Sequence, residues 1–238
     1  MVMNENKAFL TFHSVLLAIV LVGFGRSFYL KSLFLPLPAL DAPLVIHGTI
    51  LTAWYTLTVL QAWLAYKGIF RWHRKLAWLA GVNAVGVVLS ATFINTRMAS
   101  NFHSPADPEN AFVWGNYMSL IFFVALLIGG VMNRYDPEKH RRLILWASVI
   151  IIGPAFARFA FWPVFGGGID AAPLFAGGGL IAIILLLMIY DLAVLHKIKL
   201  ATLIGVASFI GAAAVSAILA ATGVGFKILA LLHIVTSQ

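Results

Sequence analysis

The sequence predicts an all-α polytopic membrane protein built as a bundle of seven membrane-spanning helices. Three observations predict this class. The chain of 238 residues is 62% hydrophobic and 10% charged, with a mean hydropathy of +0.98, whereas soluble domains carry about 25% charged residues. Its apolar runs are about 20 residues long, which a helix needs to cross a ~30 Å hydrocarbon core. The short alternating segments of a membrane barrel are not seen.

Helix-breaking residues separate the apolar segments. They are Pro36, Pro38 and Pro43 in the first connection, Pro105 and Pro108 in the third, and Gly166, Gly167, Gly168 and Pro173 in the fifth. The expected spans are residues 8–30, 44–66, 76–96, 112–132, 143–162, 174–195 and 200–222. The apolar tail from Phe226 to Val235 is too short to span, so we expect it to be interfacial or packed on the bundle. We expect residues 1–238 to form a single transmembrane domain.

The basic residues predict the orientation of the bundle. Lysines and arginines concentrate in the connections 67–75, 133–142 and 196–199, which are therefore expected to face the cytoplasm. The N-terminus is then cytoplasmic and the C-terminus outside, in a bacterial inner (cytoplasmic) membrane, with an uncleaved first span. The net charge of +8 follows from this asymmetry. It favours anionic membrane lipids as partners and requires no nucleic acid.

An internal repeat is visible at an offset of 67 residues. His73-Arg74 and Leu76 fall on His140-Arg141 and Leu143, and Gly48 falls on Gly115. The repeated unit covers residues 44–76 and 111–143, with the same orientation in both copies, so the repeat is parallel. The predicted architecture is one leading helix followed by three helical hairpins. This symmetry places His73 and His140 at equal depth, and likewise His47 and Trp114.

Several motifs of this region resemble those of a large group of bacterial multi-span membrane proteins of unknown function. The motifs are His47-Gly48, Trp54, Gln61, Trp72-His73-Arg74-Lys75-Leu76, His140-Arg141-Arg142-Leu143 and Ala155-Phe156-Ala157-Arg158. The resemblance covers about residues 44–165. It departs at Ala77, where the group usually has Gly, and at Ile144, where it usually has Met. The resemblance implies the fold and topology and no activity.

The paired histidines His73 and His140 are candidate ligands for a metal or a haem b, because neutral imidazole binds both. At most one haem can be bound in this way. A second haem would need the other repeated pair, His47 and Trp114, and tryptophan does not ligate haem iron. The alternative is that each His-Arg pair anchors the start of a span at the membrane surface. We favour this anchoring role and leave the metal or haem open.

A second group of polar residues lies near the opposite, outer ends of the spans. Arg158 follows His140 by 18 residues, which is ~27 Å along a straight helix. A charge in the apolar layer usually faces a cavity or a partner. We expect an outer-leaflet polar cavity that binds an anion, a lipid or a quinone-like molecule; its candidate residues are His47, Arg97, Asn116, Tyr117 and Arg158. Alternatively, the arginines snorkel to phosphates and the polar side chains satisfy one another between helices.

The function expected from these features is binding of a small molecule, or redox chemistry, in the membrane. The alternative is a non-catalytic accessory subunit of a larger membrane complex, and a homo-oligomer is a further possibility. A mid-span lysine for retinal, a phosphate loop and a serine nucleophile elbow are all missing from the sequence. The chain has no cysteine, which excludes thiolate chemistry. Enzymatic activity and catalytic residues stay open.

Overall fold

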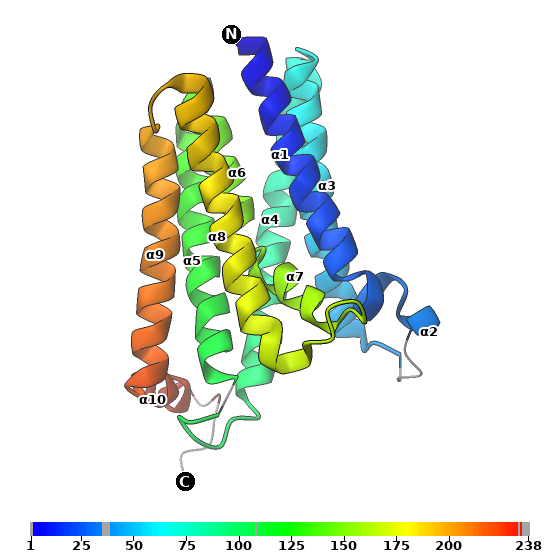
Figure 1. Cartoon of the computed structure of the whole chain (residues 1–238), viewed down its shortest axis with the longest axis vertical. Helices are drawn as coiled ribbons and strands as arrows, with labels where there is room; N and C mark the ends of the chain where they lie inside the picture. The colour runs from blue at the N-terminus through cyan, green and yellow to red at the C-terminus, as the bar shows by residue number, and fades with distance from the viewer. Residues whose placement is uncertain (1, 35–38, 108, 233, 235–238) are drawn as a thin grey trace. The chain divides into compact units, whose positions relative to one another are not determined.

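The computed structural model describes residues 2–34, 39–107, 109–232 and 234 (Figure 1). Four residues used in the sequence analysis, Pro36, Pro38, Pro108 and Val235, lie outside this part of the chain. Helices account for 83% of the structure, and the described residues contain no strand. The all-α prediction is therefore confirmed.

The elements follow one another along the chain as helices joined by short connections. They are α1 (Val2–Gly23), the π-helix η1 (Gly25–Tyr29), α2 (Lys31–Phe34), α3 (Ala42–Tyr66), α4 (Phe70–Ala99), α5 (Asn110–Met132), α6 (Pro137–Ile150), α7 (Gly153–Ala157), the 3₁₀-helix η2 (Arg158–Phe161), α8 (Gly168–Leu195), α9 (Leu200–Ala221) and α10 (Val224–Leu231).

Six of the described helices are long and apolar enough to cross a membrane: α1 from Glu5, α3, α4, α5, α8 and α9. The count rises to seven if α6 and the segment from α7 to Phe161, which are bent at a short break, form one span. The chain is thus a membrane protein by the length and apolarity of its helices. The predicted spans 44–66, 112–132 and 200–222 agree with α3, α5 and α9 to within about two residues. Helix α1 begins and ends about six or seven residues before the predicted span 8–30, and α4 and α8 each begin about six residues before theirs, α8 with Pro173 inside it.

The predicted fifth span, 143–162, is not one continuous helix. Helix α6 ends at Ile150, and α7 begins at Gly153 with Pro154 in its first turn. A proline cannot donate the hydrogen bond to the carbonyl four residues earlier, here that of Ile150, and its ring clashes with that carbonyl. The prediction of a straight 27 Å run from His140 to Arg158 was therefore wrong, because Pro154 interrupts it.

The chain forms two compact units, each assembled from two separate segments. Unit 1 comprises residues 1–88 and 152–197, and unit 2 comprises residues 89–151 and 198–238, so α4 contributes to both. In unit 1, α1 packs along α3, and α7 and η2 pack on α8. The amide of Asn83 donates to the carbonyl of Ile50 (3.2 Å), which joins α4 to α3. Whether residues 1–238 behave as a single domain stays a prediction.

Unit 2 is a packed group of three helices closed at one end by α10. Helices α5, α6 and α9 all contact one another, and α5 and α9 lie side by side in Figure 1. Helix α6 is buried on nearly every face, including Trp146 (1% exposed) and Arg142 (2% exposed). The tail was predicted to be interfacial or packed on the bundle, and its described residues pack: Leu229 of α10 lies in an apolar cluster with Ala99, Phe102, Val113 and Trp114.

Candidate functional site

Helix α1 ends earlier than predicted, and a π-helix follows it. The predicted span reached residue 30, but α1 ends at Gly23. A Cβ on Gly23 would overlap the carbonyl group of Ala155, so α1 and α7 approach closely at this point. Beyond it the backbone forms the π-helix η1, in which the Leu30 N–H donates to the Gly25 carbonyl (2.8 Å). Such π-turns occur often at functional sites.

The π-helix docks on the start of α3, next to His47. The Phe28 ring lies against Gly48 so closely that a Cβ there would overlap it. The hydroxyls of Tyr29 and Thr52 hydrogen-bond each other at 2.6 Å. This gives the His47-Gly48 pair a physical reason: the glycine makes room for Phe28, and the half-buried His47 lies beside it on α3.

Two arginines of unit 1 converge on Phe161 in η2. Arg26, carried by η1, donates from Nη1 to the carbonyl oxygen of Phe161. The guanidinium carbon of Arg158 lies 5.8 Å from the centre of the Phe161 ring and 5.7 Å from that of Phe24. The indole Nε1 of Trp162 donates to the carbonyl of Val22 (3.2 Å), which holds η2 against the end of α1.

The positive charge of these arginines is not balanced by a nearby carboxylate. Within the described part of the chain, neither Arg26 nor Arg158 forms an ion pair. The Nε atom of Arg26 is buried and makes no hydrogen bond with a described residue. Leaving the buried Nε donor of Arg26 without an acceptor is costly, so Arg26, together with the exposed Arg158, can bind an anion or a carbonyl oxygen.

An apolar groove of about 420 Å³ lies between α7, η2 and α8. These elements follow the interruption between α6 and α7. Its lining comprises Phe156, Phe159, Leu174, Phe175, Gly178 and Gly179. Gly179 is needed here, because a Cβ would overlap the Phe156 ring. Phe159 and Arg158 are neighbours in η2, so one short helix carries both an aromatic wall of the groove and a cation.

The other predicted site residues belong to unit 2, where two of them bond to polar side chains near the end of α4. The amide of Asn116 donates to Asn95 Oδ1 (3.0 Å), and the hydroxyls of Tyr117 and Thr96 hydrogen-bond at 2.9 Å. These bonds join α5 to the end of α4, which is the mutual satisfaction considered as the alternative for such side chains. Arg97 is exposed on α4.

The five predicted ligand-binding residues are thus divided between the units, with His47 and Arg158 in unit 1 and the others in unit 2. The structure brings Arg158 together with Arg26, Phe24 and Phe161 instead. Arg26 was not among the residues predicted for this site. Its position depends on the π-helix, for which the surrounding Gly23-Phe24-Gly25 gives no specific signal.

His73 and His140 have matching environments in their own units. The Nδ1–H of His73 donates to the carbonyl of Gln61 (3.1 Å), and that of His140 donates to the carbonyl of Gly130 (2.8 Å). Each histidine therefore ties the start of one helix to the preceding helix, while anchoring at the membrane surface stays a prediction. The described residues contain no group of three histidine or acidic side chains suited to a metal.

The comparisons with known proteins add no relative. No family model, curated protein or solved structure matches this chain. The function is therefore inferred from the residues and contacts described above.

Proposed function

We propose that this chain is a membrane protein that binds a small anionic or quinone-like molecule through Arg26 and Arg158 of unit 1. The convergence of the two arginines on Phe161 without a carboxylate partner supports this proposal. A negatively charged oxygen, or the carbonyl of a quinone, would supply an acceptor for the buried Arg26 Nε and for the Arg158 guanidinium. His47, beside the Gly48 that seats η1, completes the polar residues at this end of unit 1.

The same region also offers apolar surface for the rest of such a molecule. The groove with Phe156, Phe159 and Phe175 suits a ring or an alkyl chain, since ligand sites combine apolar walls with a few polar groups. Arg97, Asn116 and Tyr117 belong to unit 2, and we assign Asn116 and Tyr117 a role in joining α4 to α5. We further propose a bacterial inner membrane with the basic turns on the cytoplasmic side and Arg158 at the outer leaflet.

Thermal melting of the purified protein tests this function directly. Octanoate, inorganic phosphate and decylubiquinone are added separately, and we expect at least one to raise Tm. At a concentration 100-fold above Kd the shift is roughly 5 °C or more. The variants Arg158→Gln and Arg26→Gln should lose the shift. Tm values of wild type that none of the three compounds moves would contradict the proposal.

Arg134→Gln provides a matched control for Arg158→Gln. The Arg134 guanidinium carbon also lies near an aromatic ring, 4.5 Å from the centre of Tyr135, and it donates to the Tyr135 hydroxyl (3.2 Å). Its removal subtracts the same charge from a similar contact elsewhere. The ligand-induced shift should persist in Arg134→Gln, and its equal loss there would mean that the response reflects net charge and not the Arg158 site.

A single haem b or a metal bound through His73 and His140 is a second candidate. The hydrogen bond from each Nδ1 to a carbonyl leaves Nε2 as the atom with a lone pair, which is the arrangement that orients ligating histidines. The absorption spectrum and metal content of the purified protein distinguish the candidates. A Soret band lost in His140→Ala would favour haem, whereas a spectrum without it would leave only the structural role of the histidines.

A further inference from the structure

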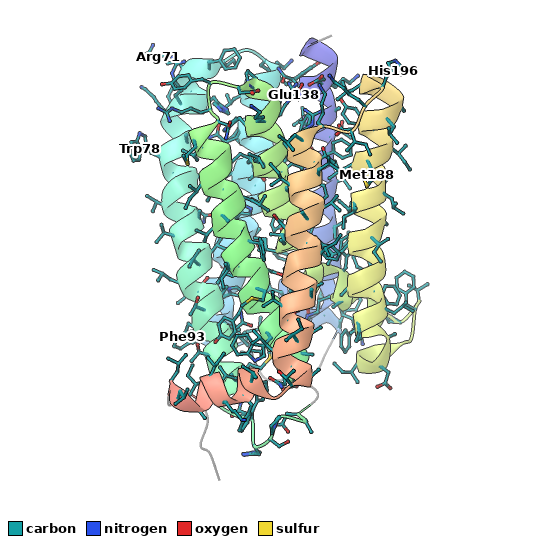
Figure 2. The ribbon with its side chains drawn as sticks, turned by 90° about the vertical axis from the view of Figure 1, so that its left-hand side faces the viewer. Arg71, Trp78, Phe93, Glu138, Met188 and His196 are labelled. Atoms are coloured by element: carbon teal, nitrogen blue, oxygen red, sulfur yellow. The ribbon has the colours of Figure 1, made fainter. Side chains whose placement is uncertain are left out.

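The turn between α3 and α4 carries an unusual concentration of exposed positive charge and aromatic surface. We call it the basic-aromatic turn and define it by Lys67, Arg71, Trp72, Arg74, Lys75 and Trp78, all of which belong to unit 1. All six side chains are exposed, Trp72 to 55% and Trp78 to 82%. Figure 2 shows Arg71 and Trp78 projecting outward from the first turns of α4.

The charge of this turn has no acidic counterpart nearby in the sequence. From residue 42 to residue 106 the chain contains no aspartate or glutamate. The cations contact rings instead: Lys75 Nζ lies 5.0 Å from the centre of the Trp72 ring, and Lys67 Nζ lies 5.5 Å from that of Tyr66. These contacts keep the ammonium groups beside the rings while leaving them accessible.

The corresponding turn between α5 and α6 differs because it contains acidic residues. It contains Asp136 and Glu138, which pair with Lys139 (3.0 Å) and Lys199 (2.6 Å). Part of its positive charge is therefore neutralised within the protein. The positive-inside tendency accounts for lysines and arginines in both turns, but it does not account for the complete lack of acids in only one.

The length of α4 places this turn at the level of lipid headgroups. A helix of 30 residues is about 45 Å long, which matches the hydrocarbon core together with both headgroup layers. Arg71 and Trp78 are separated by seven residue rises, about 10 Å along the axis. Indole rings favour this interfacial layer, so the arginines beyond them lie beside the phosphates.

We propose that the basic-aromatic turn is a binding site for the headgroups of anionic phospholipids. The cations bind the phosphate and any further negative charge of the headgroup, while Trp72 and Trp78 pack against the upper part of the acyl chains. Each lysine or arginine near a membrane surface contributes attraction to anionic lipid. This site is separate from Arg26 and Arg158 and does not depend on the function proposed for them.

Native mass spectrometry of the full chain in detergent tests the site with two short-chain lipids of equal length. Dioctanoyl phosphatidylglycerol and dioctanoyl phosphatidylcholine are added in turn, and retained lipid is counted. We expect wild type to retain the anionic lipid preferentially. The variant Arg71→Gln/Arg74→Gln/Lys75→Gln should bind it roughly tenfold or more weakly. Unchanged retention in a variant that stays monodisperse would overturn the proposal.

Two further variants separate a specific site from total charge and from misfolding. Arg134→Gln/Lys139→Gln/Lys197→Gln removes three charges from the other turns and should retain the anionic lipid within about threefold of wild type. Arg71→Lys/Arg74→Lys keeps the charge and should bind like wild type. Equal losses in the first control would refute a local site. Displacement of the lipid by an equal concentration of inorganic phosphate would instead identify a site for free anions and overturn the lipid assignment.

Discussion

Asp136 begins α6 with two interactions that both favour its charged form. Its carboxylate accepts a hydrogen bond from the Lys139 backbone N–H (3.2 Å) as the N-cap, and it pairs with the Lys139 ammonium group (3.0 Å). The Lys139 side chain, and after it the backbone hydrogen bond, hold the pKa of Asp136 below its ordinary value. Since the pKa is lower in the folded state, this stabilisation is present at neutral pH and is lost as the pH falls through the folded pKa.

We expect Asp136→Ala to lower Tm more than Asp136→Asn, because asparagine can still cap the helix. The gap between wild type and Asp136→Asn reports the charge and should narrow when melting is repeated at pH 3, which lies below the ordinary pKa of the carboxyl group. The gap between Asp136→Asn and Asp136→Ala reports the cap and should persist at that pH. A wild-type advantage over Asp136→Asn that is equally large at both pH values would show that the charge is not responsible.

Individual residues show how far the sequence predicts the candidate site. Arg158 was identifiable because an arginine in an apolar segment is costly and usually has a use. Its contacts with Phe24 and Phe161 were not predictable, since they depend on the turn after Pro154 and on the π-helix. Hydrophobic patterns register the polarity of a side chain, whereas its direction depends on the local backbone.

Helices α6 and α9 of unit 2 pack closely at Gly205. Gly205 of α9 lies against the ring of Trp146, and a Cβ would overlap it. Trp146 is only 1% exposed and cannot move aside easily. We expect Gly205→Ala to destabilise the protein by about 1–3 kcal/mol through overpacking, measured as a lower Tm in detergent.

Gly177 in α8 is the matched control for Gly205. A Cβ at Gly177 has no described atom within 4 Å. Gly177→Ala should therefore leave Tm unchanged or raise it, because alanine favours a helix by up to about 1 kcal/mol relative to glycine. If both substitutions lowered Tm equally, the cause would be the helical glycine itself and not contact with Trp146.

The predicted spans were accurate where helix-breaking or charged residues mark the ends of an apolar run. Helices α3, α5 and α9 begin and end within about two residues of the expected spans, since proline, glycine and charge mark their ends. The break in the fifth span was not predicted although Pro154 was visible, because prolines also occur within continuous membrane helices. The parallel repeat stays a prediction: the two histidines make similar bonds, but α4 is long and exposed while α6 is short and buried.

On the scale of the whole molecule, the bent segment from α6 to η2 determines the number of crossings, which is seven if it is one broken span and six if it is re-entrant. We expect a broken span. The basic connections favour a crossing, because 133–142 and 196–199 then lie on the same side.

The lack of cysteine in the chain allows a direct test with single introduced cysteines. Tyr135→Cys and Lys197→Cys should react with a membrane-impermeant maleimide only after the cells are opened, while Ala106→Cys and Val164→Cys should react in intact cells. Labelling of Tyr135→Cys and Val164→Cys from the same side would show a re-entrant segment. Labelling in intact cells of Lys197→Cys but not Ala106→Cys would reverse the orientation.

The burial of α6 between Arg142 and Ile150 has a consequence for how the protein is made. Its 14 residues are about 21 Å long, too short for the hydrocarbon core, and they include the buried Arg142. Such a segment is a poor substrate for insertion on its own. One of its covering helices, α9, begins 50 residues after α6 ends and does not yet exist when α6 leaves the ribosome. During synthesis we therefore expect α6 to remain beside α5 until α9 is inserted and covers it.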